Sequence, residues 1–267
     1  MEKILKFKSF DGLELEGTLN IPNDKKNDVS VILVHGIQTN RDEYGFYSRL
    51  AEFLSSNGIS SFRFDHRGNE KYIDDSVRLL TLSGVINDIE MAIKTFYKND
   101  VVNKLTLIGA SFGGGVSHYL ANKRKEQFES CILLAPVLEY RIDYLKDEGL
   151  FNNSLLNSSG INQLDAKNFL ITSGRPFSRA IINELGYFDA VTENKIPTTI
   201  IHGTMDSAVK LEYSRKFCKK ADKVNLIEIE GTEHGFAKPG DDELTDPVTI
   251  ENHIKVYKII MQAIKSI

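Results

Sequence analysis

A serine, an aspartate and a histidine are spaced along this sequence as nucleophilic catalysis would require. Ser111 is the centre of Gly109-Ala110-Ser111-Phe112-Gly113, which fits the pattern G-x-S-x-G. In this nucleophile elbow a sharp turn from a strand into a helix lifts the serine hydroxyl clear of the sheet. The flanking glycines are needed because a side chain there would collide with the neighbouring strand and helix. The apolar run before the motif and the helical pattern after it favour this interpretation.

A serine hydroxyl needs a base, which is normally a histidine oriented by a carboxylate. Asp206 follows the predicted strand 198–202, and His234 follows the predicted strand 224–229. Because the carboxyl ends of parallel strands share one edge of a sheet, we expect these side chains to meet Ser111 there. The spacing therefore predicts Ser111 as the nucleophile, His234 as the general base and Asp206 as the residue that orients the imidazole.

Two backbone N–H groups are expected to bind the oxyanion that forms when the serine attacks. Phe112 follows the serine at a predicted helix N-terminus, where the helix dipole favours negative charge. His35-Gly36-Ile37 follows the predicted strand 29–34, and the N–H of Ile37 is the second predicted donor. The sequence thus predicts an oxyanion hole made by Ile37 and Phe112.

The other histidines and the cysteines indicate structural roles. His35 and His202 end strands beside glycines and are expected to support the site, whereas His66, His118 and His253 are expected at the surface or in packing. Two cysteines, Cys131 and Cys218, make no disulfide framework, and Cys131 lies in an apolar run typical of a core strand. No cluster has the spacing of metal ligands, so we expect no metal and no cofactor.

Strands and helices alternate along most of the chain, which predicts a mostly parallel, eight-stranded sheet flanked by helices, an α/β fold. The first two strands form a hairpin around Asp11-Gly12. The predicted strands are 3–8, 13–20, 29–34, 59–64, 104–108, 131–135, 198–202 and 224–229. The predicted helices are 42–57, 85–99, the stretch from the serine to about 123, 210–220 and 249–265.

The alternation stops between residues 137 and 195. This segment mixes asparagine- and serine-rich stretches with aromatic residues, and a plain connection needs neither that length nor those aromatics. We predict an inserted cap over 137–195, on a core formed by 1–136 and 196–267. The cap aromatics are expected to form a small core of their own and to wall a pocket that excludes water.

The composition is that of an ordinary globular protein, with 267 residues, 33 basic and 37 acidic side chains and a net charge of −4. The sequence contains no long run of like charges, so we expect no nucleic acid as a partner. The N-terminal stretch lacks the apolar region of a signal peptide, and no stretch is long enough for a membrane span. We expect a cytoplasmic protein with no membrane partner. The sequence leaves open whether the chain forms a homodimer.

These motifs resemble those of the α/β-hydrolase superfamily along the whole chain. They are His35-Gly36, Asp65-x-Arg67-Gly68, the Ser111 elbow, His202-Gly203-x-x-Asp206 and His234-Gly235. More narrowly, the chain is similar to short intracellular esterases of the cinnamoyl/feruloyl-esterase and acyl-hydrolase type, which also insert a cap before the strand that bears the acid. The stretch 174–182 resembles part of such a cap. Those esterases often have Gln after the nucleophile, where this chain has Phe112.

The motifs and the resemblance predict a serine-dependent hydrolase that cleaves a small acyl or aryl ester through an acyl-enzyme. A thioesterase or acyltransferase acting on acyl-CoA or acyl-carrier substrates would use the same residues. Arg175 and Arg179 near the cap could then supply a basic rim. A serine peptidase and a catalytically silent ligand-binding protein are further alternatives. The fold alone does not select among these substrates.

Overall fold

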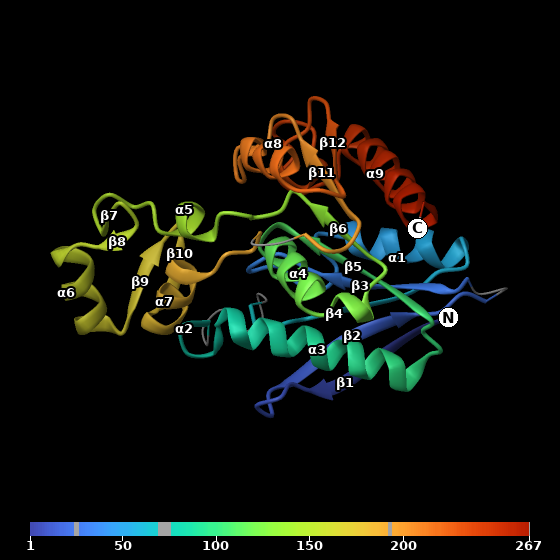
Figure 1. Cartoon of the computed structure of the whole chain (residues 1–267), viewed down its shortest axis with the longest axis horizontal. Coiled ribbons are helices and arrows are strands. Elements are labelled where there is room, and N and C mark those ends of the chain that lie inside the picture. Colours follow the sequence, from blue (N-terminus) through green and yellow to red (C-terminus); the bar gives the residue numbers. More distant parts are fainter. Residues whose placement is uncertain (24–26, 69–75, 192–193, 267) are drawn as a thin grey trace.

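The computed structural model describes residues 1–23, 27–68, 76–191 and 194–266. An eight-stranded sheet forms the core, in the order β1-β2-β4-β3-β5-β6-β11-β12 (Figure 1). β1 pairs antiparallel with β2, and β2 pairs antiparallel with β4, whereas the remaining neighbours are parallel. The predicted mostly parallel, eight-stranded sheet is confirmed. The strands are β1 (Glu2–Lys8), β2 (Glu14–Asn20), β3 (Val29–Val34), β4 (Ser60–Phe64), β5 (Lys104–Ala110), β6 (Ser130–Leu134), β11 (Thr198–Gly203) and β12 (Val224–Ile229).

Helices cover both faces of this sheet because its central strands are apolar on both sides. In β3, Ile32 and Val34 pack into one apolar cluster, and Val31 and Leu33 pack into the other, as the two-residue period of a strand requires. The first cluster also contains residues of α3 (Leu82–Asn99), α4 (Ser111–Lys123) and α8 (Leu211–Lys220). The second contains residues of α1 (Phe46–Ser56) and α9 (Pro247–Lys265).

The first predicted helix begins later than its pattern indicated. α1 starts at Phe46 rather than at residue 42, because Glu43, Tyr44 and Gly45 have φ angles of 47°, 52° and 80°. These left-handed conformations cannot belong to a right-handed helix. Tyr44, which was expected on the buried face of that helix, is 61% exposed. The prediction was wrong at this end of the helix.

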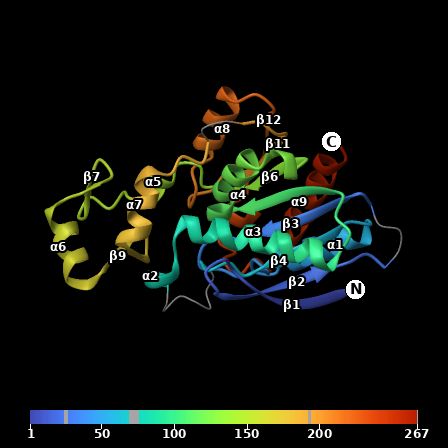
Figure 2. The ribbon, with the colours of Figure 1, turned by 60° about the horizontal axis from the view of Figure 1, so that its bottom comes forward.

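The segment 137–195 contains short elements that lie together on the left of Figures 1 and 2. They are α5 (Tyr140–Tyr144), β7 (Phe151–Asn152), β8 (Leu155–Leu156), α6 (Ser158–Lys167), β9 (Phe169–Thr172), β10 (Arg175–Ser178) and α7 (Arg179–Tyr187). Two small antiparallel pairs form, β7 with β8 and β9 with β10. The short helices α2 (Ser76–Leu79), η2 (Lys125–Gln127) and η3 (His234–Phe236) complete the described elements.

The aromatic residues of this segment continue the main core instead of forming a separate one. The ring of Phe112 in α4 lies edge-on to Tyr140 and Tyr144, and Tyr144 lies edge-on to Phe177 of β10. Tyr140 also donates a hydrogen bond to the Phe112 carbonyl and accepts one from the Val116 N–H at 3.0 Å. The expectation of a separate small core was therefore wrong, and α5 is anchored directly on the start of α4.

Candidate active site

Ser111 lies at the junction of β5 and α4, with a φ of 49°. Such a left-handed conformation strains a residue with a side chain, and persists where the surrounding structure holds it. Close packing explains the two flanking glycines. A Cβ on Gly109 would lie 2.5 Å from the Gly113 carbonyl oxygen, and a Cβ on Gly113 would lie 2.3 Å from the carbonyl oxygen of His35. The turn that presents the serine therefore depends on glycine at both positions.

Asp206 and His234 meet beyond the ends of β11 and β12. Nδ1 of His234 donates to Oδ2 of Asp206 at 2.7 Å. The other carboxylate oxygen accepts the N–H groups of Ala208 at 2.9 Å and Val209 at 2.8 Å. The Asp206 carboxylate is buried and the imidazole of His234 is 35% exposed. In the neutral imidazole this bond favours the tautomer with its proton on Nδ1, in which Nε2 is the basic nitrogen.

His202 contributes a second partner for the same carboxylate. Its Nε2 lies 3.2 Å from Oδ2 of Asp206, and its Nδ1 lies 2.9 Å from the hydroxyl of Ser214. Burial opposes ionisation of Asp206, but the hydrogen bonds from His202 and His234 outweigh it and hold the pKa of Asp206 well below its usual range. Asp206 is thus ionised at neutral pH.

Ser111 and His234 line the same two cavities. One, of about 220 Å³, extends toward the segment 137–195 and includes Ile37, Tyr144 and Arg175 in its wall. The other, of about 340 Å³, lies over an apolar floor that includes Phe46 and Phe236. In the described structure Ser111 and His234 share these cavities without a hydrogen bond between them. Catalytic hydrogen bonds are often long in free enzymes and shorten when substrate binds.

The two predicted oxyanion donors belong to segments that adjoin Ser111. Phe112 is the second residue of α4, where backbone N–H groups have no partner within the helix. Ile37 follows the end of β3 and lines the smaller cavity. Among the described residues, neither N–H donates a hydrogen bond to the protein. The assignment of these two groups to an oxyanion hole stays a prediction.

A pair of stacked imidazoles supports the loop that carries Ile37. The rings of His35 and His66 lie 3.7 Å apart and nearly parallel, and both are fully buried. The His66 N–H donates to Nε2 of His35 at 3.1 Å, and Nε2 of His66 lies 3.1 Å from the His35 carbonyl oxygen. Burial lowers the pKa of His66 to about 4, so both rings act as neutral groups near pH 7. Sequence reasoning allowed His66 a packing role but did not connect it with His35.

Glu43 and Asp143 are charged residues at the site that were missed from the sequence, whereas Arg175 was expected near the cap. Glu43 lines both cavities, and Asp143 and Arg175 line the smaller one. Burial raises the pKa of Asp143 to about 6. Glu43 had been assigned to the first turn of a helix, where an acidic residue is ordinary. Asp143 and Arg175 lie in the segment whose fold the sequence pattern did not predict.

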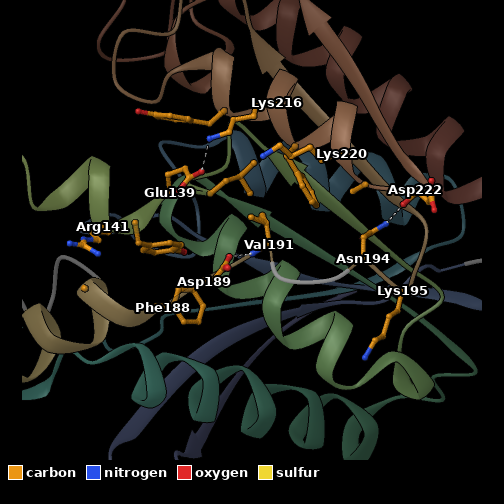
Figure 3. A pocket seen from close by; sticks show the side chains of 16 residues that line it. Glu139, Arg141, Phe188, Asp189, Val191, Asn194, Lys195, Lys216, Lys220 and Asp222 are labelled. Atoms are coloured by element: carbon orange, nitrogen blue, oxygen red, sulfur yellow. Dashed lines mark hydrogen bonds and ion pairs between the residues drawn. The ribbon is translucent and has the colours of Figure 1, made fainter. Parts of the chain in front are cut away.

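Another cavity is larger, at about 870 Å³, but its wall contains neither Ser111 nor His234. It lies between α8 and the segment 137–195, and its wall includes Glu139, which pairs with Lys216 at 3.7 Å (Figure 3). Cavity size therefore does not mark the site here, whereas the Asp206–His234 pair does. Among the described residues, no group of three or more His, Cys, Asp or Glu side chains could hold a metal ion, and no helix is long and apolar enough to cross a membrane.

Residues 25–168, which include β3, the Ser111 elbow and β6, match the family model described as serine aminopeptidase, S33. The chain belongs to this family. S33-family chains are α/β-hydrolases, so the resemblance predicted from the motifs is confirmed, and the protein is a hydrolase. No curated protein matches the sequence.

Solved structures share the fold along nearly the whole chain. Est1E from Butyrivibrio proteoclasticus, also solved with ferulic acid bound, is 21% identical, with a TM-score of 0.75 over 98% of this chain and 99% of its own. Mouse α/β hydrolase domain-containing protein 10 is 14% identical, with a TM-score of 0.72 over 99% of each chain. A Xanthomonas campestris α/β serine hydrolase without lid is 15% identical, with a TM-score of 0.66 over 99% of this chain and 94% of its own.

Proposed function

We propose that this S33-family chain hydrolyses carboxylic esters through an acyl-enzyme formed on Ser111. The observation that carries the proposal is the Asp206–His234 hydrogen bond of 2.7 Å, made by a histidine that shares two cavities with a strained serine. A positioned nucleophile, a base and a residue that orients the base are the three parts that covalent serine catalysis needs. The support for an ester as the substrate is this geometry together with the likeness to Est1E.

The proposed reaction starts when Oγ of Ser111 attacks the ester carbonyl carbon and its proton passes to Nε2 of His234. The C–O bond to the alcohol then breaks, and the leaving oxygen takes that proton. The acyl group stays on Ser111. A water molecule, deprotonated by the same nitrogen, next attacks the acyl carbon, and the carboxylic acid leaves as Ser111 regains its proton.

The charges of the site fit these steps. The imidazolium that forms on His234 would be stabilised by Asp206, which the hydrogen bonds from His202 and His234 keep ionised. The negative charge on the substrate oxygen would be bound by the N–H groups of Ile37 and Phe112. A donor of this kind contributes roughly 10²–10³ in rate in characterised enzymes. The segment 137–195 would act as the cap over the acyl group.

The test is hydrolysis of p-nitrophenyl esters from acetyl to long-chain acyl, together with a feruloyl ester. We expect activity in the wild type and a loss of several orders of magnitude in Ser111→Ala. Ser56→Ala, at an exposed serine of α1, is the matched control and should retain full activity. A fluorophosphonate should label the wild type and not Ser111→Ala. Ester hydrolysis that survives the loss of Ser111, or an unlabelled Ser111, would refute the proposal.

A thioesterase or acyltransferase is the second candidate, and basic residues in the smaller cavity favour it. Lys146 and Arg175 line that cavity and could bind an anionic carrier group. Arg179, the other basic residue of the predicted rim, is an exposed residue paired with Asp165. Competition between an acyl-CoA and the matching oxygen ester decides between the two activities, and an aminoacyl p-nitroanilide tests for peptidase activity.

A further inference from the structure

Glu43 brings a further carboxyl group to the proposed active site, in both of the cavities that Ser111 lines. Its two carboxyl oxygens accept the N–H of Gly36, at 3.3 Å and 3.2 Å. A Cβ on Gly36 would lie 3.1 Å from Oε1 of Glu43 and 3.4 Å from Cβ of Ser111. The carboxyl group of Glu43 and the side chain of Ser111 therefore both lie against Gly36, beside the loop that carries the Ile37 N–H.

The backbone holds Glu43 in this place at a cost. Glu43 and Tyr44 both have left-handed φ angles, of 47° and 52°, although neither is glycine. Left-handed conformations strain residues that have a side chain, and strain of this kind concentrates at functional sites. Tyr47, fully buried in the first turn of α1, packs behind this turn and donates to the Val34 carbonyl at 3.1 Å. The turn is thus held in place from both β3 and α1.

The larger cavity beside Glu43 differs in charge from the smaller one. The smaller cavity contains Lys146 and Arg175 as well as carboxyl groups. Apart from His234, the larger cavity has no basic residue in its described wall, neither lysine nor arginine. Its acidic residues are Glu43, Glu233, Asp241 and Asp242, and its aromatic residues are Tyr44, Phe46 and Phe236. Aromatic faces together with carboxylates are the surroundings that organic cations prefer.

We propose that Glu43 is a specificity-determining residue, and that its carboxylate selects esters that carry an organic cation, such as a quaternary ammonium group, in the larger cavity. This inference rests on the proposed ester hydrolysis at Ser111 and adds the chemical class of the substrate. A cation within several ångströms of Glu43 gains Coulomb energy that a neutral group of the same shape does not. We expect a selectivity of about tenfold or more in kcat/KM for the cationic ester.

The ionisation of Glu43 offers a second way to test the proposal without a substitution. Burial raises the pKa of Glu43 to about 7, against the lowering effect of the Gly36 N–H and His234. The carboxyl group is thus mostly neutral at pH 6 and mostly charged at pH 8.5. The other titratable and charged groups around the cavities that Glu43 lines are Tyr44, Tyr47, Asp143, Tyr144, Lys146, Arg175, Glu233, His234, Asp241 and Asp242.

Matched substrates isolate the charge from the shape. Butyrylcholine and 3,3-dimethylbutyl butyrate differ only in the quaternary atom of the alcohol, which is a charged nitrogen in the first ester and a neutral carbon in the second. The p-nitrophenyl esters of 4-(trimethylammonio)butyrate and 5,5-dimethylhexanoate make the same comparison in the acyl group. The ratio of kcat/KM within each pair is measured at pH 6 and pH 8.5 in the wild type, Glu43→Gln and Glu52→Gln. Glu52 is an exposed residue of α1 and serves as the control.

We expect the cationic ester to be preferred in one pair by about tenfold at pH 8.5, and by less at pH 6, in the wild type and in Glu52→Gln. In Glu43→Gln, whose amide oxygen can still accept the Gly36 N–H, the preference should fall several-fold and lose its pH dependence. Ratios near one in both pairs, or a preference that Glu43→Gln retains, would overturn the inference while leaving ester hydrolysis intact. Absence of Ser111-dependent hydrolysis of all four esters would overturn the proposed function as well. Should Glu43→Gln fail to fold, the pH dependence of the ratio is compared between the wild type and Asp143→Asn, because Asp143 also ionises near pH 6; a pH dependence that Asp143→Asn retains supports Glu43, and one that it loses overturns the inference.

Discussion

Replacing Gly113 with alanine tests the close packing on which the serine turn depends. The added Cβ would lie 2.3 Å from the His35 carbonyl oxygen and 2.8 Å from that of Val34. Both are backbone atoms at the end of β3, so no side chain can rotate away, and the strand end must move by roughly 1 Å to restore an ordinary contact. Overpacking of this kind costs about 1–3 kcal/mol. Alanine in a helix gains up to about 1 kcal/mol over glycine, which offsets only part of that cost.

Gly186→Ala is the matched control, because Gly186 lies in α7 with open space around it. The nearest atom to its added Cβ is Cδ1 of Leu145, at 3.9 Å. There the helix propensity acts alone, and we expect stabilisation by about 0.5–1 kcal/mol. The two Gly→Ala changes should therefore have opposite signs. Because the helix term is common to both changes, their free energies of unfolding should differ by the overpacking cost of about 1–3 kcal/mol, or roughly 2–12 °C in Tm.

Activity gives a second readout for Gly113→Ala. The end of β3 leads directly to Gly36 and Ile37, so a shift of roughly 1 Å would displace the proposed oxyanion donor and lower kcat by about 10²-fold. Urea unfolding and p-nitrophenyl ester hydrolysis measure the two effects. If Gly113→Ala were as stable as Gly186→Ala and fully active, the close approach of β3 to the turn would be wrong, and with it our explanation of the motif.

Two further predictions concern the ionisable groups of the site. Asp206→Asn should lower kcat by roughly 10⁴-fold at neutral pH, because the amide no longer fixes the proton on Nδ1 of His234. Steady-state kinetics, with Ser111→Ala measured in parallel, give the loss in kcat. A loss of less than tenfold would contradict the orienting role of Asp206. His66 is fully buried with a pKa lowered to about 4, so the unfolded chain binds a proton below pH 6.5 that the folded chain does not. Stability from this group is complete above pH 6.5 and declines toward pH 4. Between pH 7 and pH 5 the wild type should lose about 2 kcal/mol more than His66→Gln in urea unfolding, and equal losses would refute the assignment.

Local patterns in the sequence predicted most of the sheet and the candidate catalytic residues. Ile32 and Val34 alternate with Val31 and Leu33 across two buried faces, so a strand there follows from the order of the residues alone. Once the strands are parallel, their carboxyl ends share one edge. Residues that directly follow those ends, such as Ser111 and Asp206, are then brought toward one another by chain geometry.

The turn at Glu43 shows where such local patterns fail. The stretch 42–57 has helical periodicity, yet its first residues adopt left-handed conformations because the Gly36 N–H and the packing of Tyr47 fix the turn. Nothing in the neighbouring residues encodes those contacts. The charge that Glu43 brings to Ser111 could be recognised only after β3 and α1 were packed together.

By itself, then, the sequence determined the α/β fold and the order in which Ser111, Asp206 and His234 follow their strands, because burial and turn formation depend on residues close together in the chain. Only the tertiary structure showed which other residues pack around these three. His66 stacks on His35, Tyr140 binds the start of α4, and Arg175 reaches the smaller cavity. These contacts join residues at least 24 positions apart, and their geometry is set by how the layers pack rather than by any local pattern.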